Sequence, residues 1–249
     1  MSIAVRLLTS LIVLFGCCVL GACGGPTPHE NFNAAYDAQT KGDYVTALRL
    51  YRPLAQQGND SAQFNLGRMY ANGQGVTQDY AEAVSWYRKA AEQGNAFAQF
   101  DLGLLYEKGR GGAQNYAEAV LWYRKAADHG NAFAQFHLGL SYASGRGVTQ
   151  DYAEAVSWYR KAAEQGNAFA QLNLGFQYAS GSGVAREYVP AYMWFNLAVL
   201  RFDASDREYR DKAMEERDQL AAKMTPAQIA EAQKLAREWK PKPEPEPER

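Results

Sequence analysis

The feature that most constrains this chain is a repeat of 36 residues, which runs through most of its 249 residues. Four units follow one another without insertions, and the first and third differ at only 6 of 36 positions. A period of about 20 to 50 residues is typical of solenoids, in which each repeat buries its apolar face against its neighbours. We therefore expect one continuous stack rather than two separate domains. The units are 61–96, 97–132, 133–168 and 169–204.

Each unit divides into two helices separated by a glycine turn. In the first unit an apolar stripe with helical spacing stops at Gly73-Gln74-Gly75, where the glycines interrupt the helix. Asp79 is then placed to cap a second helix, and Glu82 stands three residues later as in a capping box. Gly94 is expected to end that helix in a left-handed conformation. The pattern predicts an all-α chain built from helix pairs.

The joint pattern of the units resembles the Sel1-like repeat, a relative of the tetratricopeptide repeat. It reads Ala-Gln-x-x-Leu-Gly-x-x-Tyr, then Gly-x-Gly-Val, then Tyr-Ala-Glu-Ala-Val-x-Trp-Tyr-Arg-Lys-Ala-Ala-Glu-Gln-Gly-Asn. The resemblance implies an all-α, right-handed α/α superhelical solenoid over residues 31–204, with 31–60 as a divergent and shortened first unit. In the fourth unit Pro190 replaces the expected Glu and Phe202 the terminal Gly, so its last turn should differ.

Residues 205–240 are predicted to form C-terminal capping helices. The sequence at 205–208, which begins with Ser205, reads as a capping box that starts a helix reaching about Lys223. A second box at 225–228 has Pro at the first helical position and opens a helix to about Trp239. Polar terminal helices would cover the last apolar face of the stack. Residues 241–249 alternate Pro with charge, which predicts an extended, disordered tail.

Residues 1–22 have the features of a lipoprotein signal peptide. The apolar run 7–19 has 13 residues, whereas a membrane-spanning helix needs about 18 or more; an uncleaved anchor is the alternative. The sequence at 20–23 resembles a bacterial lipobox, which implies that Cys23 becomes the acylated first residue of the mature chain. A competing match ends at Cys17, but Phe15 is bulky where a small residue is expected. Residues 23–30 then form the lipidated Cys and a flexible tether. Gly24 follows the Cys, and the lack of Asp at this position resembles the outer-membrane rather than the inner-membrane sorting signal of Gram-negative lipoproteins.

Composition and motifs argue against several classes of function. Lys plus Arg is 26 and Asp plus Glu is 27, so no positive excess favours a nucleic acid partner. The Gly-x-Gly segments lack the following Lys-Ser/Thr and the preceding strand of a phosphate site, and their period makes them turns. His29, His129 and His137 lack the spacing of metal ligands, so no metal or cofactor is expected.

Catalytic residues are not expected either. No Ser-x-x-Lys or Gly-x-Ser-x-Gly motif occurs, and no Cys/His pair of the mature chain reads as catalytic. A cysteine-rich secreted branch of the resembled family is linked to penicillin binding and hydrolysis. That branch carries a Cys pair in each repeat, and the repeats of this chain contain no Cys. We therefore predict a protein that is not an enzyme.

Differences between the near-identical units point to a binding face. The resemblance to the tetratricopeptide pattern implies that the first helix of each unit lines the concave face. Its predicted groove positions flank the Leu-Gly pair and are Phe64, Arg68, Phe100, Leu104, Phe136, Leu140, Leu172 and Phe176, with Phe97, Phe133 and Phe169 nearby. Such a row predicts an apolar groove for a partner helix or extended peptide. Packing between adjacent first helices is the alternative, and the sequence leaves both open.

Two further patterns separate binding from packing. Arg68 aligns with Leu104, Leu140 and Phe176, and a packing position would rarely accept that exchange, which favours a binding face. One Trp per unit recurs at a core spacing, which predicts packing between the second helices. These residues are Trp86, Trp122, Trp158 and Trp194.

Taken together, the sequence favours a monomeric, membrane-anchored, non-enzymatic scaffold that binds a protein or peptide on its concave face. It is expected in the bacterial cell envelope, at the outer membrane and facing the periplasm. One alternative is a hydrolase acting on the cell wall or on β-lactams. Another is a surface-exposed or secreted factor that engages host proteins.

Overall fold

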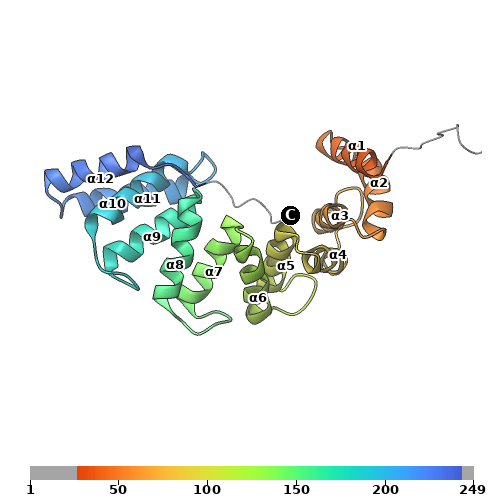
Figure 1. Cartoon of the computed structure of the whole chain (residues 1–249), viewed down its shortest axis with the longest axis horizontal. Coiled ribbons are helices and arrows are strands. Elements are labelled where there is room, and N and C mark those ends of the chain that lie inside the picture. Colours follow the sequence, from red (N-terminus) through yellow and green to blue (C-terminus); the bar gives the residue numbers. More distant parts are fainter. Residues whose placement is uncertain (1–26, 243–249) are drawn as a thin grey trace, which may run out of the picture.

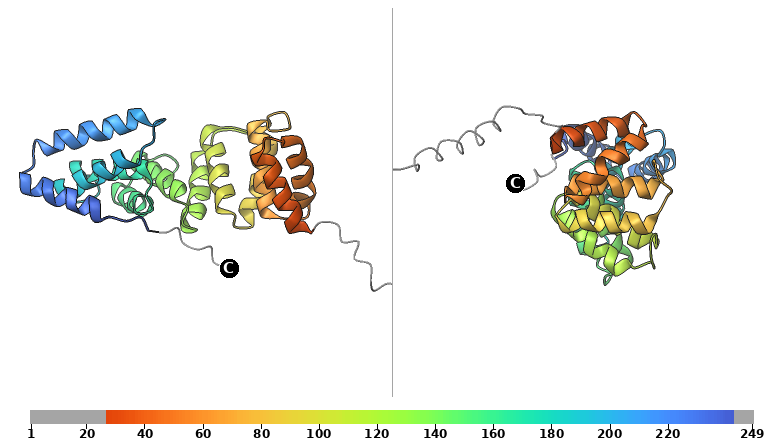
Figure 2. Two further views of the ribbon diagram at one scale, coloured as in Figure 1. Left: turned by 90° about the horizontal axis from the view of Figure 1, so that it is seen from above. Right: turned by 90° about the vertical axis from the view of Figure 1, so that its right-hand side faces the viewer.

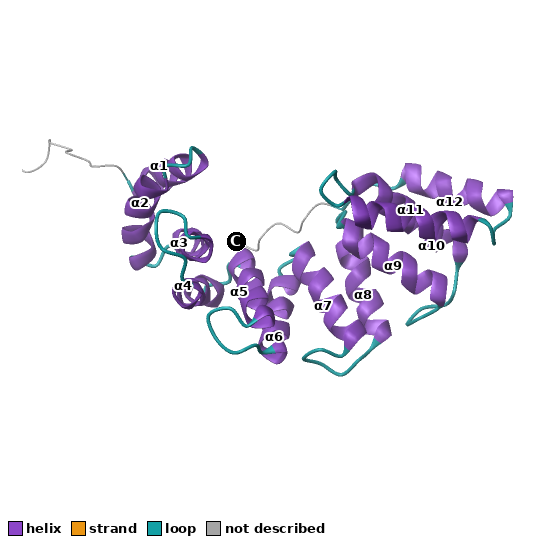
Figure 3. Cartoon of the chain, turned by 180° about the vertical axis from the view of Figure 1, so that it is seen from behind, coloured by secondary structure: helices purple, strands orange, loops and turns teal. Residues whose placement is uncertain are grey.

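A computed structural model describes residues 27–242, and every regular element within this range is an α-helix (Figure 3). The helices are α1 Pro28–Thr40, α2 Tyr44–Gln56, α3 Asp60–Asn72, α4 Tyr80–Glu92, α5 Ala96–Lys108, α6 Tyr116–Asp128, α7 Ala132–Ser144, α8 Tyr152–Glu164, α9 Ala168–Ser180, α10 Tyr188–Arg201, α11 Arg207–Ala221 and α12 Pro226–Glu238.

From α1 to α11, each helix packs mainly against its neighbours in the chain, whereas α12 packs on α10. The pairs follow one another along an arc, with α1 at one end and α12 at the other (Figure 1). Seen from one end, the pairs lie behind one another as a stack (Figure 2). The predicted all-α solenoid of helix pairs is confirmed.

The two glycines of each turn serve different purposes. Gly145 ends α7 with φ +72°, a left-handed conformation that other residues adopt with strain. Gly147 allows a close approach, because a Cβ on it would lie 2.3 Å from the carbonyl oxygen of Tyr116 at the start of α6. The Gly-x-Gly segments are therefore turns that also pack against the preceding unit.

The caps of α4 follow the prediction with one exception. The Asp79 side chain accepts hydrogen bonds from the backbone N–H groups of Ala81 and Glu82, and Gly94 has φ +95° after the end of α4. The backbone N–H of Asp79 donates to the Tyr70 carbonyl at 2.9 Å. Because that donor is already used, Glu82 does not complete the expected capping box.

Tryptophans of the second helices join consecutive units. Trp122 is 8% exposed and packs in the core formed by Tyr87 and its neighbours in the preceding unit. Trp158 and Trp194 pack in the same way one and two units later, and Trp86 is half-buried. The predicted packing role of this row is confirmed.

A buried glutamine in each first helix adds polar links between units. Gln135 donates to the Ala127 carbonyl at 3.2 Å, and its own carbonyl oxygen accepts from Gln165 Nε2 of the next turn at 2.8 Å. Gln171 makes the bond equivalent to that between Gln135 and Ala127, donating to the Ala163 carbonyl at 3.1 Å. Its Oε1 is buried without a hydrogen-bond partner, because Arg201, which replaces the donating glutamine at this position, has its guanidinium 4.3 Å from the centre of the Trp239 ring instead.

The start of the described chain corrects the predicted tether. Thr27 caps α1, and its side chain and that of Glu30 form a capping box with Pro28 at the first helical position. The last four residues assigned to a flexible tether over 23–30 therefore belong to a helix and its cap. Cys23 and the predicted signal peptide lie outside the described residues. None of the helices in residues 27–242 is long and apolar enough to cross a membrane.

The C-terminal helices begin partly as expected. The box of Thr225 with Gln228 at the start of α12 is confirmed, but the one predicted from Ser205 is wrong. There, the backbone N–H and hydroxyl groups of Ser205 both donate to the Asp203 carboxylate, so an Asp turn precedes α11. Helices α11 and α12 both pack on α10. The fourth unit ends differently, as predicted, with Phe202 extended at φ −65° and ψ 131°.

The predicted tail begins with a fixed contact. The backbone N–H of Lys242 donates to the Glu164 carbonyl at 2.8 Å, and its ammonium lies 2.7 Å from the Glu164 carboxylate. Residues 243–249 of the predicted tail lie outside the described residues.

Candidate functional site

The predicted groove residues all lie on the first helices of their units, α3, α5, α7 and α9. In Figure 1, α3 and α5 lie on the inner side of the arc relative to α4 and α6. These first helices therefore line the concave side of the stack.

Phenylalanines of neighbouring first helices meet in pairs. The ring centroids are 6.0 Å apart for Phe64–Phe97, 6.0 Å for Phe100–Phe133 and 5.8 Å for Phe136–Phe169. Phe97 and Phe133 remain 57% and 58% exposed, whereas the first ring of each pair is half-buried. The row thus packs between adjacent helices and also leaves apolar surface open. We call these six residues the phenylalanine ridge.

The other predicted groove residues divide into three environments. Arg68 is exposed, with its guanidinium 5.6 Å from the Phe64 ring. Leu104 and Leu140 are half-buried beside the ridge. Phe176 packs on Phe195 at 5.2 Å, with Lys212 of α11 5.3 Å from its ring, and Leu172 belongs to the core.

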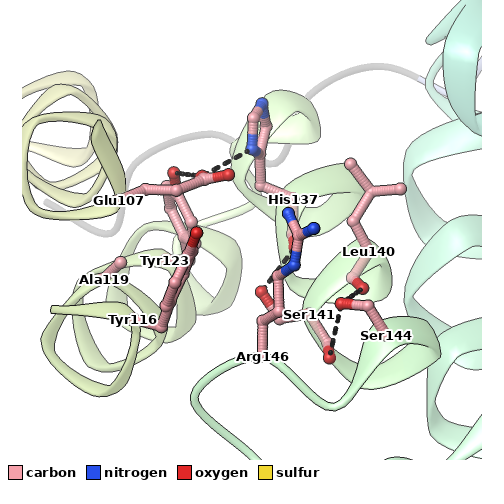
Figure 4. A pocket seen from close by; sticks show the side chains of 9 residues that line it. All are labelled: Glu107, Tyr116, Ala119, Tyr123, His137, Leu140, Ser141, Ser144 and Arg146. Atoms are coloured by element: carbon pink, nitrogen blue, oxygen red, sulfur yellow. Dashed lines mark hydrogen bonds and ion pairs between the residues drawn. The ribbon is translucent and has the colours of Figure 1, made fainter. Parts of the chain in front are cut away.

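A polar cluster lies where α5, α6 and α7 meet (Figure 4). The Tyr123 hydroxyl donates to the Glu107 carboxylate, and His137 Nδ1 lies 3.3 Å from Glu107 Oε2. The hydrogen bond from His137, followed by that from Tyr123, lowers the pKa of Glu107 although partial burial opposes this shift. Burial, with the adjacent carboxylate, raises the pKa of Tyr123. We call Glu107, Tyr123 and His137 the polar triad.

The polar triad borders a pocket of about 230 Å³. Apolar and polar groups line it together, and α7 contributes Leu140 and Ser144 on the side opposite Glu107 and Tyr123 (Figure 4). The complete lining is Glu107, Tyr116, Ala119, Tyr123, His137, Leu140, Ser141, Ser144 and Arg146. The pocket also adjoins the ridge, because the His137 ring lies 5.4 Å from Phe100 and 5.5 Å from Phe136.

Asp101 is a second unusual carboxylate on α5. Burial raises its pKa, while a hydrogen bond with Tyr87 and the charge of Arg68 oppose the shift. Asp101 aligns in the repeat with Asn65, His137 and Asn173, and Glu107 aligns with Ala71, Ala143 and Ala179. Sequence analysis missed Asp101 and Glu107 as site residues, although these departures from the repeat were the available signal.

The three histidines are not brought together. His29 lies on α1 beside Asn33, His129 follows α6 and contacts Gln99 at 3.1 Å, and His137 belongs to the polar triad. Within residues 27–242, no group of three or more His, Cys, Asp or Glu side chains is placed to hold a metal ion. The site offers an apolar ridge next to paired hydrogen-bonding groups, an arrangement suited to recognition.

Comparison with known proteins gives a consistent result. A family model described as the Sel1 repeat matches residues 33–59, 60–95, 96–131, 132–167 and 168–201. No curated protein gives a significant match.

Two solved structures share both fold and sequence with this chain. One is a protective antigen present in uropathogenic Escherichia coli strains that displays an SLR fold, with a TM-score of 0.75 and 37% identity. The match covers 86% of this chain but only 45% of the antigen. The other is a Sel1 repeat protein from Oxalobacter formigenes, with a TM-score of 0.70, 34% identity and coverage of 85% and 87% of the two chains.

Proposed function

The chain belongs to the Sel1 repeat family, and from that premise we propose that it binds a protein or peptide partner along its concave face. Sel1 repeat proteins are generally non-enzymatic scaffolds, and protein–protein interaction is their common role.

The observation that carries the proposal is the exposure of Phe97 and Phe133 at the starts of α5 and α7, two of the first helices. Two large aromatic rings more than half open to solvent, beside the half-buried Leu104 and Leu140, form apolar surface that a partner would cover. Aromatic residues are enriched among those that dominate binding energy at protein interfaces. An extended peptide or an amphipathic helix has the shape to follow such a row.

The polar triad supports selectivity along this face. Glu107 belongs to the second 36-residue unit and His137 to the third, and neither residue recurs at its position in the other units. Their contact therefore marks one position along an otherwise regular groove. Polar groups at defined positions fix the register of a bound chain, because a misplaced partner leaves them unpaired. A partner that places a hydrogen-bonding group at the pocket next to His137 would be selected over one that does not.

We further propose that the protein is held at the outer membrane through lipid on Cys23 and faces the periplasm as a monomer. Only residues 24–27 separate this Cys from the first turn of α1, a span of at most about 14 Å. The solenoid would then lie against the membrane surface. Labelling with radioactive palmitate should mark the wild type and leave the Cys23→Ala variant unlabelled; equal labelling of both would refute lipid anchoring there.

The concave-face proposal is tested by cross-linked capture from native cell envelopes. The Leu104→Glu/Leu140→Glu double variant should lose a protein that the wild type captures, while circular dichroism shows unchanged helicity. Leu121→Glu is the matched control, because Leu121 is 56% exposed on α6 and lies outside the groove. If all three forms capture the same protein equally, the partner binds another face.

A second candidate role is favoured by one neighbour. The Escherichia coli structure with 37% identity is a protective antigen, which is compatible with exposure at the cell surface and contact with host proteins. Protease treatment of intact cells separates this role from a periplasmic one. Digestion of the solenoid in intact cells would support surface exposure, and digestion only after the outer membrane is opened would support the periplasm.

A further inference from the structure

The end of the described chain lies against the middle of the stack. Lys242 makes two contacts with Glu164, one through its backbone N–H and one through its ammonium. Glu164 is the last residue of α8, and Pro241 approaches Gly166 in the turn that follows. The chain after α12 is thereby brought to the turn between α8 and α9.

That turn touches the corresponding turn of the preceding unit. Gln165 Nε2 donates to the Gly130 carbonyl at 2.9 Å, and Gly130 lies in the turn that precedes α7. The exposed Phe133 is the second residue of α7, three positions after Gly130. The exposed Phe97 has the same place on α5, one unit further on. Lys242 and the exposed rings of the ridge therefore lie along the same edge of the stack.

The following segment has the composition and length to reach these rings. Residues 243–249 read Pro-Glu-Pro-Glu-Pro-Glu-Arg, and such sequences favour the polyproline II conformation. Seven residues at about 3.1 Å each span roughly 22 Å. Neighbouring units touch directly here, through the 2.9 Å hydrogen bond from Gln165 to Gly130 and the Phe100–Phe133 pair with ring centroids 6.0 Å apart. The segment is long enough to pass Phe133 and arrive at Phe97.

We propose that residues 243–249 dock on the phenylalanine ridge of their own chain, crossing Phe133 toward Phe97. Proline-rich segments bind surfaces lined by aromatic rings, and their preformed extended conformation keeps the entropic cost of docking low. Charge supports this direction, since the glutamates of the segment approach the exposed Arg68, whose guanidinium lies beside the Phe64 ring.

The proposal concerns a contact within one chain and holds whether or not an external partner binds there. It is tested in the full chain by photo-cross-linking, with benzoylphenylalanine replacing Phe133 or, as a control, Leu121 on α6. The two positions are matched in exposure, at 58% and 56%. Mass spectrometry of the monomer band then identifies the residues joined to the probe.

If the segment is docked, the yield of cross-links to residues 243–249 should be at least about fivefold higher from position 133 than from position 121. Docking raises the effective concentration of the segment at the ridge. The Lys242→Glu variant should reduce the yield at position 133, since its new charge repels Glu164. Equal yields at the two positions, adducts only between separate chains, or a yield unaffected by Lys242→Glu would overturn the proposal.

Discussion

Gly139 faces the ring of Tyr159 so closely that a Cβ on this glycine would lie 2.6 Å from the ring carbons Cδ1 and Cε1. Tyr159 is itself 1% exposed and fixed in the core. The same contact recurs one unit earlier between Gly103 and Tyr123, at 2.6 Å from Cε1. In these units the glycine backbone of the first helix thus packs directly against the tyrosine ring of the second helix. This contact explains why the Leu-Gly pair and the Tyr recur together.

Replacing Gly139 by Ala should therefore destabilise the solenoid despite the higher helix propensity of Ala. Overpacking of a closed core costs about 1–3 kcal/mol, and Tyr159 has no space into which to move. Urea unfolding followed by circular dichroism should show a lower midpoint. Gly112→Ala is the control, because nothing lies within 4 Å of a Cβ at that position. Equal midpoints for both variants would show that the helix pair can open.

Asp101→Asn should stabilise the fold at neutral pH. Burial raises the pKa of Asp101 above its ordinary value of 3.8, despite Tyr87 and Arg68 beside it. When the pKa of an acid is higher in the folded than in the unfolded state, folding favours its neutral form. The free-energy cost of burying the charged carboxylate therefore appears as the pH rises above 3.8. Asn is also the residue of the first and fourth units at this position, Asn65 and Asn173.

The Tm difference between Asp101→Asn and wild type should therefore be positive at pH 7, equivalent to roughly 1 kcal/mol. It should shrink toward zero at about pH 3, where both side chains are neutral. A lower Tm for the variant at pH 7 would mean that the hydrogen bond with Tyr87 and the charge of Arg68 outweigh the cost of burying the charge of Asp101.

The buried glutamines allow a matched comparison within one chain. Gln135 makes hydrogen bonds through both ends of its amide, whereas Gln171 leaves Oε1 without a partner. Gln135→Met should thus cost more free energy of unfolding than Gln171→Met, by about 1 kcal/mol, the typical value of one hydrogen bond. Differential scanning calorimetry of the two variants measures this. Equal losses would mean that the bond to Gln165 adds no stability.

Much of the fold could be predicted because the repeat places the same local signals at the same positions four times. Asp79 and Gly94 each act locally, as an N-cap and a left-handed helix end, so their roles follow from sequence alone. Apart from the capping box expected at Glu82, the wrong predictions concern residues outside the four regular units. Thr27 and Glu30 form the same kind of capping box that was recognised at Thr225, but glycines before them favoured a tether. At Ser205, a competing bond to Asp203 decided the start of α11.

The site was harder to predict because it depends on exposure and on contacts between units. The sequence identifies the phenylalanine row, but only the three-dimensional stack shows that Phe100 is half-buried while Phe133 remains open. Glu107 and His137 are separated by 30 positions and meet only because α5 and α7 are adjacent in the stack. No sequence motif has a spacing that would predict this pair, although each residue differs from those at the equivalent positions of the other units.

The central claim, that a partner binds the concave face, is tested most directly by the affinity of the captured partner for three purified forms of this protein. Isothermal titration calorimetry would compare the wild type, Leu104→Glu/Leu140→Glu and the control Leu121→Glu. Our account predicts at least about tenfold weaker binding for the double variant, a loss of about 1.4 kcal/mol or more, and an unchanged Kd for Leu121→Glu. An unchanged Kd for the double variant, with its helicity intact, would contradict the claim.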